Sequence, residues 1–163
     1  MVAAASDLLA ILREVKDPEL PMLDVVALGI VRDVQATQAG VRVDITPTYS
    51  GCPALKTIED DIVTALHEHG FASVEVRTVY TPAWTTDWMS AEAKESLRAA
   101  GIAPPGRVEA EPLVMLTRAV PVTVCPFCGS VETEERSEFG STACKAIHYC
   151  RSCRQPFDRF KAL

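Results

Sequence analysis

The stretch CPFCGSVETEERSEFGSTACKAIHYCRSC, residues 125–153, decides the fold of the C-terminal part of the chain. It begins and ends with a C-x2-C pair, and two such pairs complete a tetrahedral site of four thiolates. The four candidate metal ligands are Cys125, Cys128, Cys150 and Cys153. The residues between the pairs suit a β-hairpin, with VETEERS and TACKAIHY as strands and a turn at EFGS. This pattern predicts a structural zinc ribbon, and the alternative is a rubredoxin-like iron centre with the same ligands.

A further cysteine, Cys144, lies within the predicted hairpin. If residues 144–150 are extended, Cys144 lies about 20 Å from Cys150, at about 3.3 Å per residue, and cannot share the same metal. Two interpretations of Cys144 remain open. It is either a buried small hydrophobic residue or a reactive thiol whose pKa is lowered by Lys145. We expect His148 to be an ordinary strand residue and a substitute ligand only if one of the four cysteines fails.

Charge and cysteine content are uneven along the 163 residues. Five of the six cysteines lie in the last 39 residues. Residues 1–120 hold 10 Lys and Arg against 17 Asp and Glu, whereas residues 121–163 hold 6 against 5. The stretch APPGRVEAEP, residues 103–112, has the composition of a boundary. We therefore expect a first domain over residues 1–102, a linker over 103–120 and a ribbon over 121–163.

The composition also restricts location and partners. No apolar run approaches the roughly 20 residues that a membrane span requires, and the N-terminus lacks the basic start of a signal peptide. We expect a cytoplasmic protein without a membrane partner. In a reducing cytosol the cysteines are better explained as metal ligands or reactive thiols than as disulfides. The weakly charged ribbon beside an acidic domain predicts no binding to nucleic acid.

The first domain combines helical and strand patterns. The predicted elements are a helix capped by Ser6 and stopped by DPELP at 17–21, strands at 30–36 and 41–46, a helix at 53–69, a strand at 74–80 and a capped helix at 90–101. This order predicts an α+β fold, with a small α-β-β-α-β-α domain followed by the ribbon hairpin.

Cys52 stands apart from the other cysteines, where the sequence TYSGCP joins a predicted strand to a predicted helix. Pro53 suits the first position of a helix, which would place Cys52 at the N-cap. There the helix dipole and the free N–H groups would stabilise a thiolate. A reactive or metal-handling thiol and a structural one both remain open. His67 and His69, at the far end of the same helix, are too distant to activate Cys52, which argues against a Cys–His hydrolase.

Several stretches of this sequence resemble known families. DPELP (17–21), LGIVRDV (28–34), TYSGCP (48–53) and PAWTTDWM (82–89) resemble the small domain of bacterial SufT-type proteins and of the eukaryotic cytosolic iron–sulfur targeting factor. Two further stretches, SEFGSTACKA (137–146) and CRSCRQPFDRFK (150–161), restrict the resemblance to a smaller group of proteins. The chain over roughly residues 6–163 is similar to the PaaD/PaaJ family of phenylacetate-degradation proteins.

The resemblance implies an accessory protein without catalytic activity of its own. Such a protein would mature or assemble the multicomponent phenylacetyl-CoA oxygenase (epoxidase) by delivering iron or an iron–sulfur cluster. Its partners would be subunits of that oxygenase, either the iron–sulfur reductase or the di-iron catalytic subunit. The cysteine of the family's GCP motif corresponds to Cys52, and the four ribbon cysteines correspond to the family's metal ligands. The alternative is an oxygenase component that uses rubredoxin-like iron for electron transfer.

The resemblance also suggests supporting residues. Asp17, Glu19, Thr48 and Ser50 are the candidates for residues that support the Cys52 site. The stretch FGSTACKA is more specific than a hairpin requires, which favours a functional surface around Cys144. Cys52 and Cys144 would then cooperate on a transient cluster, either within one chain or across a homodimer. Relatives often carry an acid at the position of Ala27, for which Asp24 is the candidate replacement.

Overall fold

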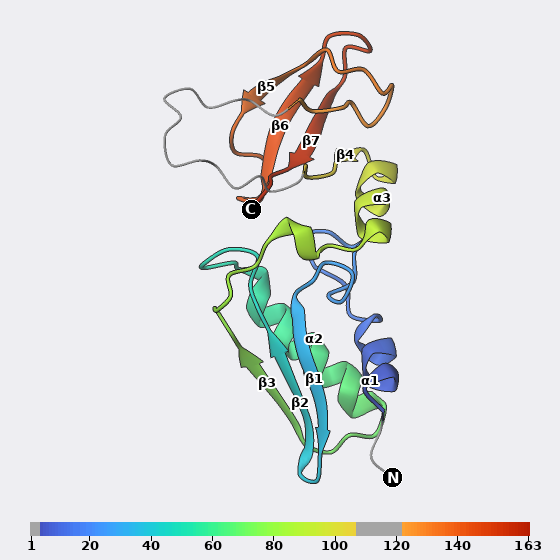
Figure 1. Ribbon diagram of the computed structural model, residues 1–163, viewed down its shortest axis with the longest axis vertical. Coiled ribbons are helices and arrows are strands. Elements are labelled where there is room, and N and C mark those ends of the chain that lie inside the picture. The colour runs from blue at the N-terminus through green and yellow to red at the C-terminus, as the bar shows by residue number, and fades with distance from the viewer. Residues whose placement is uncertain (1–3, 107–121) are drawn as a thin grey trace. The chain divides into compact units, whose positions relative to one another are not determined.

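The computed structural model describes residues 4–106 and 122–163, which divide into two compact units (Figure 1). The first unit comprises Met1–Trp84 and Trp88–Ala93, and the second comprises Thr85–Asp87 and Lys94–Leu163. Most of the expected linker over 103–120 lies outside the described residues. Within the described residues, no helix is both long enough and apolar enough to cross a membrane.

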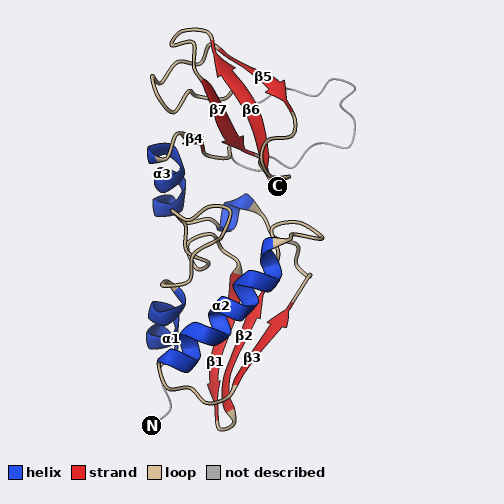
Figure 2. Ribbon diagram, turned by 180° about the vertical axis from the view of Figure 1, so that it is seen from behind, coloured by secondary structure: helices blue, strands red, loops and turns tan. Residues whose placement is uncertain are grey.

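The first unit is a three-stranded sheet with helices packed on one face (Figure 2). Its elements are α1 (Ala5–Leu12), β1 (Val31–Thr37), β2 (Gly40–Ile45), α2 (Ala54–Glu68) and β3 (Val74–Thr78). The strand order is β1-β2-β3, in which β1 and β2 are antiparallel and β2 and β3 are parallel. The helix α2 makes the crossover that a parallel pair requires. A 3-10 turn η1 (Thr86–Trp88) and the helix α3 (Ala91–Ala99) follow along the chain, and most of their residues belong to the second unit.

Sequence periodicity explains how this core forms. Along β2, Val41, Val43 and Ile45 are buried and alternate with half-buried residues, as the pleat of a strand requires. Along α2, Ile58 and Ile62 are buried at helical spacing, so one stripe of the helix covers the sheet. The predicted order of helices and strands is confirmed.

The start of α1 differs from the prediction. The helix begins at Ala5, with Ala4 as its N-cap, and no side chain caps it. The carbonyl of Ala4 accepts hydrogen bonds from the N–H groups of Asp7 and Leu8, at 3.0 and 3.2 Å. Ser6 therefore lies inside the first turn of the helix, and its predicted role as the cap is wrong.

Two tryptophans hold the loop before β1. The Nε1–H of Trp84 donates to the carbonyl of Leu28 at 3.2 Å, and Trp84 is buried. The guanidinium carbon of Arg32 lies 3.5 Å from the ring centroid of Trp88. The backbone of Gly29 runs so close to Trp88 that an added Cβ would lie 2.8 Å from its carbonyl oxygen. Trp84 and Trp88, the two tryptophans of the PAWTTDWM motif, therefore pack against the LGI motif within this unit.

The second unit is a four-stranded sheet that contains the predicted hairpin. Its strands are β4 (Ile102–Ala103), β5 (Thr133–Ser137), β6 (Lys145–Cys150) and β7 (Pro156–Phe160), in the order β4-β7-β6-β5. The hairpin of β5 and β6 is antiparallel, with a register shift between Glu135 and Ser137. Two strands were not predicted from the sequence: β7, which pairs antiparallel with β6, and β4, which pairs parallel with β7.

We predict that Gly29→Ala destabilises the first unit more than Gly70→Ala does. Both glycines have positive φ, +79° and +89°, but an added Cβ at Gly70 meets no heavy atom within 4 Å. Gly70→Ala should therefore lower the free energy of unfolding by about 1 kcal/mol through backbone strain alone. Gly29→Ala adds a clash with Trp88 and should lower it by about 2–4 kcal/mol. Urea unfolding of both variants measures the difference, and equal losses would contradict the close packing of Gly29 on Trp88.

Candidate metal centre and thiol loop

Four cysteine sulfurs converge in the second unit. The Sγ atoms of Cys125, Cys128, Cys150 and Cys153 all lie within 4.8 Å of one another. The distance is 3.7 Å between the sulfurs of Cys125 and Cys153, and 3.6 Å between those of Cys128 and Cys150. A tetrahedral ion with metal–sulfur bonds of about 2.3 Å requires sulfurs about 3.8 Å apart. The donor set therefore fits one four-thiolate metal ion.

Two turns of the same form present these sulfurs. In the first turn, the N–H of Gly129 donates to the carbonyl of Cys125 at 3.0 Å. In the second, the N–H of Arg154 donates to the carbonyl of Cys150 at 2.9 Å. Gly129 and Arg154 both have positive φ, +74° and +60°. The positive φ of Arg154 was not predicted from the sequence, although a comparison of CPFCG with CRSCR shows arginine where the first turn has glycine.

The environment of the sulfurs influences their protonation. The backbone N–H of Cys153 hydrogen-bonds to Cys150 and is the main cause that lowers the pKa of the Cys150 thiol to about 7. Burial raises the pKa of the Cys153 thiol to about 12. A metal ion needs deprotonated thiols, so binding must release protons. The affinity for metal should consequently decrease as the pH falls.

His148 and Cys144 lie outside this group of four. His148, in β6, is 2% exposed, and its Nε2 lies 3.5 Å from the Oε2 of Glu135 on the neighbouring strand. Cys144 comes just before β6 and is 5% exposed, with its Sγ 3.0 Å from the Oγ1 of Thr142. The ammonium group of Lys145 lies 3.4 Å from the carboxylate of Asp158. The charge expected to activate Cys144 is therefore partly neutralised by a neighbouring acid.

Cys52 lies in the loop between β2 and α2, in the first unit. The N–H of Thr46 donates to the carbonyl of Ile30 at 2.9 Å, and the N–H of Val79 donates to the carbonyl of Ile45 at 2.8 Å. The start of β1 and the ends of β2 and β3 thus meet at the sheet edge where this loop begins (Figure 1). The thiol-bearing residue is half-buried.

The predicted N-cap position of Cys52 is wrong by one residue. Pro53 is the N-cap of α2 and already has helical backbone angles, with φ −69° and ψ −24°. The N–H of Leu55 donates to the carbonyl of Cys52 at 3.3 Å, which extends a turn ahead of the helix. Cys52 therefore directly precedes the N-cap, beside the positive end of the helix dipole.

The four candidate supporting residues lie in two different loops. Thr48 is half-buried and Ser50 exposed, both in the loop that carries Cys52. Asp17 is buried, and its Oδ1 accepts hydrogen bonds from the N–H groups of Glu19 and Leu20, both at 2.8 Å. Asp17 thus stabilises its own turn, and Glu19 is half-buried on that turn.

Asp24 has a similar local role. Its Oδ1 accepts hydrogen bonds from the N–H groups of Val26 and Ala27, at 3.1 and 2.7 Å. Its Oδ2 lies 3.9 Å from the ammonium group of Lys16. The structure therefore shows Asp24 stabilising the turn that contains Ala27.

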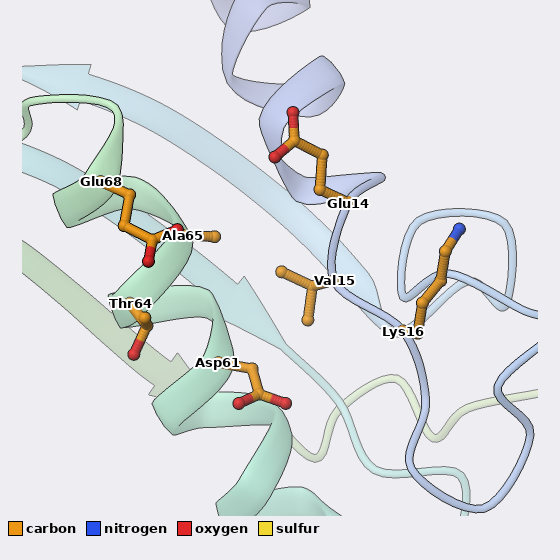
Figure 3. Close-up of a pocket in the computed structure, with 7 residues that line it drawn as sticks. All are labelled: Glu14, Val15, Lys16, Asp61, Thr64, Ala65 and Glu68. Atoms are coloured by element: carbon orange, nitrogen blue, oxygen red, sulfur yellow. The ribbon is translucent and has the colours of Figure 1, made fainter.

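A pocket of about 350 Å³ opens beside α2 (Figure 3). It is lined by Glu14, Val15, Lys16, Asp61, Thr64, Ala65 and Glu68. Its lining residues on α2 begin nine positions after Cys52, roughly 13 Å along the helix at about 1.5 Å per residue.

Among the described residues, the four ribbon cysteines are the one group of three or more potential ligands close enough to share a metal ion. The pocket is thus separate from both candidate sites.

Comparison with known proteins identifies the class and then the family. A family model described as iron-sulfur cluster assembly protein matches residues 5–78, and one described as PaaD zinc beta ribbon domain matches residues 109–161. The chain is 46% identical to a putative 1,2-phenylacetyl-CoA epoxidase subunit of Escherichia coli K12. That alignment covers 94% of this chain and 90% of the relative. The chain therefore belongs to the PaaD family.

Shorter relatives match the first part of the chain. The Fe-S protein maturation auxiliary factor SufT of Staphylococcus aureus is 44% identical over 50% of this chain and 93% of its own length. The factor YitW of Bacillus subtilis is 37% identical over 58% of this chain and 94% of its own. A solved DUF59 domain from Bacillus anthracis, 35% identical, covers 57% of this chain and 90% of that one with a TM-score of 0.54. Together with the ribbon match, these relatives confirm the predicted fold class.

We predict that removing the metal unfolds the ribbon but not the first unit. Incubation with a strong chelator, or the substitution Cys150→Ser, should abolish metal binding and the dispersed amide resonances of residues 122–163 in an NMR spectrum. Resonances of β1, β2 and α2 should persist, because the core of the first unit contains no ribbon residue. Cys144→Ser is the matched control and should retain about one metal ion per chain. Loss of metal in that control would contradict the four-ligand site.

Proposed function

We propose that this chain is an accessory protein that matures or assembles the phenylacetyl-CoA epoxidase by delivering iron or an iron–sulfur cluster to it. The proposal is supported by the similarity of this chain to two kinds of relatives at once. The chain follows a relative named as an epoxidase subunit over 94% of its length, and its first part is similar to relatives named as Fe-S maturation factors. A delivery domain over residues 1–102, a linker over 103–120 and a docking ribbon over 121–163 would fit this role.

Cys52 is the residue that we assign to iron or cluster handling. It is half-buried rather than fully enclosed, and it directly precedes the N-cap of α2, at the positive end of the helix dipole. A single thiolate occupies only part of the coordination shell of iron, which suits transfer by ligand exchange. Thr48 and Ser50 supply hydroxyl groups in the same loop, whereas Asp17 and Glu19 lie in a separate turn that Asp17 stabilises and would support the site from there.

The ribbon has a different role in the proposal. Its four cysteines would hold zinc in a closed tetrahedral site, and the ion would supply folding free energy to this small unit. The protein would have no catalytic activity of its own. It would act in the cytoplasm on the reductase or the di-iron subunit of the epoxidase, and a homodimer would let Cys52 of two chains share one cluster.

A second candidate function is an oxygenase component that transfers electrons through iron in the ribbon. Four thiolates bind iron as well as zinc, and Cys128 is exposed, which would give electrons a short path to the ion. Metal analysis separates the two functions, because ribbon iron would be coloured and redox-active whereas zinc would be neither.

We predict that Cys52→Ser removes iron and acid-labile sulfide from protein purified without oxygen, but leaves about one zinc ion per chain. The measurement is metal and sulfide analysis with a visible spectrum, followed by an assay of epoxidase maturation, which should fall to near background. Cys144→Ser is the companion variant. Equal loss in both variants would support a cluster shared by the two cysteines, and retention in Cys144→Ser would assign Cys144 to packing.

Two outcomes would contradict this function. Full maturation by Cys52→Ser would exclude delivery through that thiol. Iron in the ribbon, unchanged by either substitution, would favour the electron-transfer component instead.

A further inference from the structure

One position distinguishes the two metal-binding turns of the ribbon. Gly129 and Arg154 each follow the second cysteine of a pair, have positive φ and donate to the carbonyl of the first cysteine. Among the described residues, Arg154 is the one non-glycine residue with positive φ. Glycine adopts this conformation without steric cost, whereas an L side chain is destabilised there. The second turn therefore carries an arginine at the expense of stability.

Packing does not explain this choice of residue. Arg154 is exposed, and its guanidinium forms no hydrogen bond or ion pair with any residue that the structure describes. A Cβ added to Gly129, in the equivalent turn, meets no heavy atom within 4 Å. A turn of this form is thus open to solvent, and its stability does not depend on a side chain at this position.

The other accessible cations of the ribbon have partners. They are Arg136 and Arg151, which pair with Glu134, and Lys161, whose Nζ donates to the carbonyl of Ala143 at 3.0 Å. The remaining two, Lys145 and Arg159, are buried. In the described part of the ribbon, Arg154 is therefore the one exposed cation whose side chain has no hydrogen-bonding or ion-pair partner within the protein.

Stabilisation of the cysteine sulfurs by Arg154 does not explain the arginine at this position either. The sulfur of Cys150 receives hydrogen bonds from the backbone N–H groups of residues 152 and 153. The guanidinium of Arg154 donates none to the four sulfurs in the described structure. The Cys150 sulfur is thus stabilised by the backbone of the turn, not by the side chain of Arg154.

We propose that Arg154 is a docking residue whose guanidinium pairs with carboxylates on the surface of the client epoxidase subunit. This inference rests on the proposed function and identifies the ribbon surface that meets the client. A guanidinium binds a carboxylate through two parallel hydrogen bonds, so it gives orientation as well as attraction. Because the turn fixes the backbone at Arg154, the cation extends from a rigid support next to the metal centre. Backbone strain that does not stabilise the fold is typical of residues with a functional role.

The test is Arg154→Gly in the full, metal-loaded chain. The melting temperature should stay the same or rise, because glycine relieves the backbone strain, and the metal content should not change. Association with purified epoxidase subunits, measured by biolayer interferometry, should weaken by about tenfold, as expected for loss of a charge-assisted hydrogen-bonded pair. Arg154→Lys retains a cation in the same backbone conformation and should recover part of this loss.

Arg151→Gln provides a matched control. Arg151 is also exposed and lies three residues away, but its charge is already paired with Glu134. Its replacement should leave the association unchanged. Higher ionic strength should weaken the wild-type complex more than the Arg154→Gly complex, since salt screens a pair that the variant lacks.

Each remaining outcome would overturn the docking role. Wild-type association of Arg154→Gly would show that the client does not use this cation. A lower melting temperature or lost metal in Arg154→Gly would assign the residue to the metal site. If the wild-type chain itself binds no epoxidase subunit, the proposed function fails and the docking role fails with it, which distinguishes that case from failure of the docking role alone.

Discussion

The convergence of four cysteine sulfurs on one point is the constraint on which the ribbon depends. The buried core cluster around them consists of Ala103, Cys125, Cys150 and Phe157, with Cys153 packed against it. Three of these five residues are candidate metal ligands. A metal ion held by the four sulfurs would tie both turns to this cluster, in addition to other buried apolar residues of the unit such as Leu97 and Phe160. The strand β6 ends at Cys150, and β7 begins beyond the second turn, so the sheet is built outward from the metal centre.

A different constraint organises the first unit. The parallel pairing of β2 with β3 requires a long crossover, and α2 supplies it. The carboxyl ends of both strands therefore face the same edge, and the loop that leaves β2 reaches the start of α2 there. In open sheets this edge is where loops gather functional groups. Cys52 lies in that loop, between β2 and α2, and the buried stripe of α2 anchors the helix that follows it.

The two thiol sites differ in how many sulfurs surround the position that a metal would occupy, and they therefore suit different chemistry. In the ribbon, four sulfurs surround one position, two of the ligands are fully buried, and the donor set leaves no open site for exchange. Around Cys52, one half-buried sulfur lies beside exposed hydroxyl and glycine residues. The first arrangement fits a single, permanently held ion. Under the proposed function, the second would suit a ligand that is released.

Features that depend on local spacing could be predicted from the sequence alone. These are the order of helices and strands, the buried stripe of α2, the β5–β6 hairpin, the four ligands and the resemblance to the PaaD family. Capping was less predictable, because the first helical N–H depends on where the preceding chain turns, and so Ser6 and Cys52 were misplaced. Only the tertiary structure revealed β4, since its pairing of Ile102 with Asp158 joins distant residues and leaves no local pattern. The left-handed backbone at Arg154 likewise arises because the turn must bring two sulfurs together, a requirement that no single residue type records.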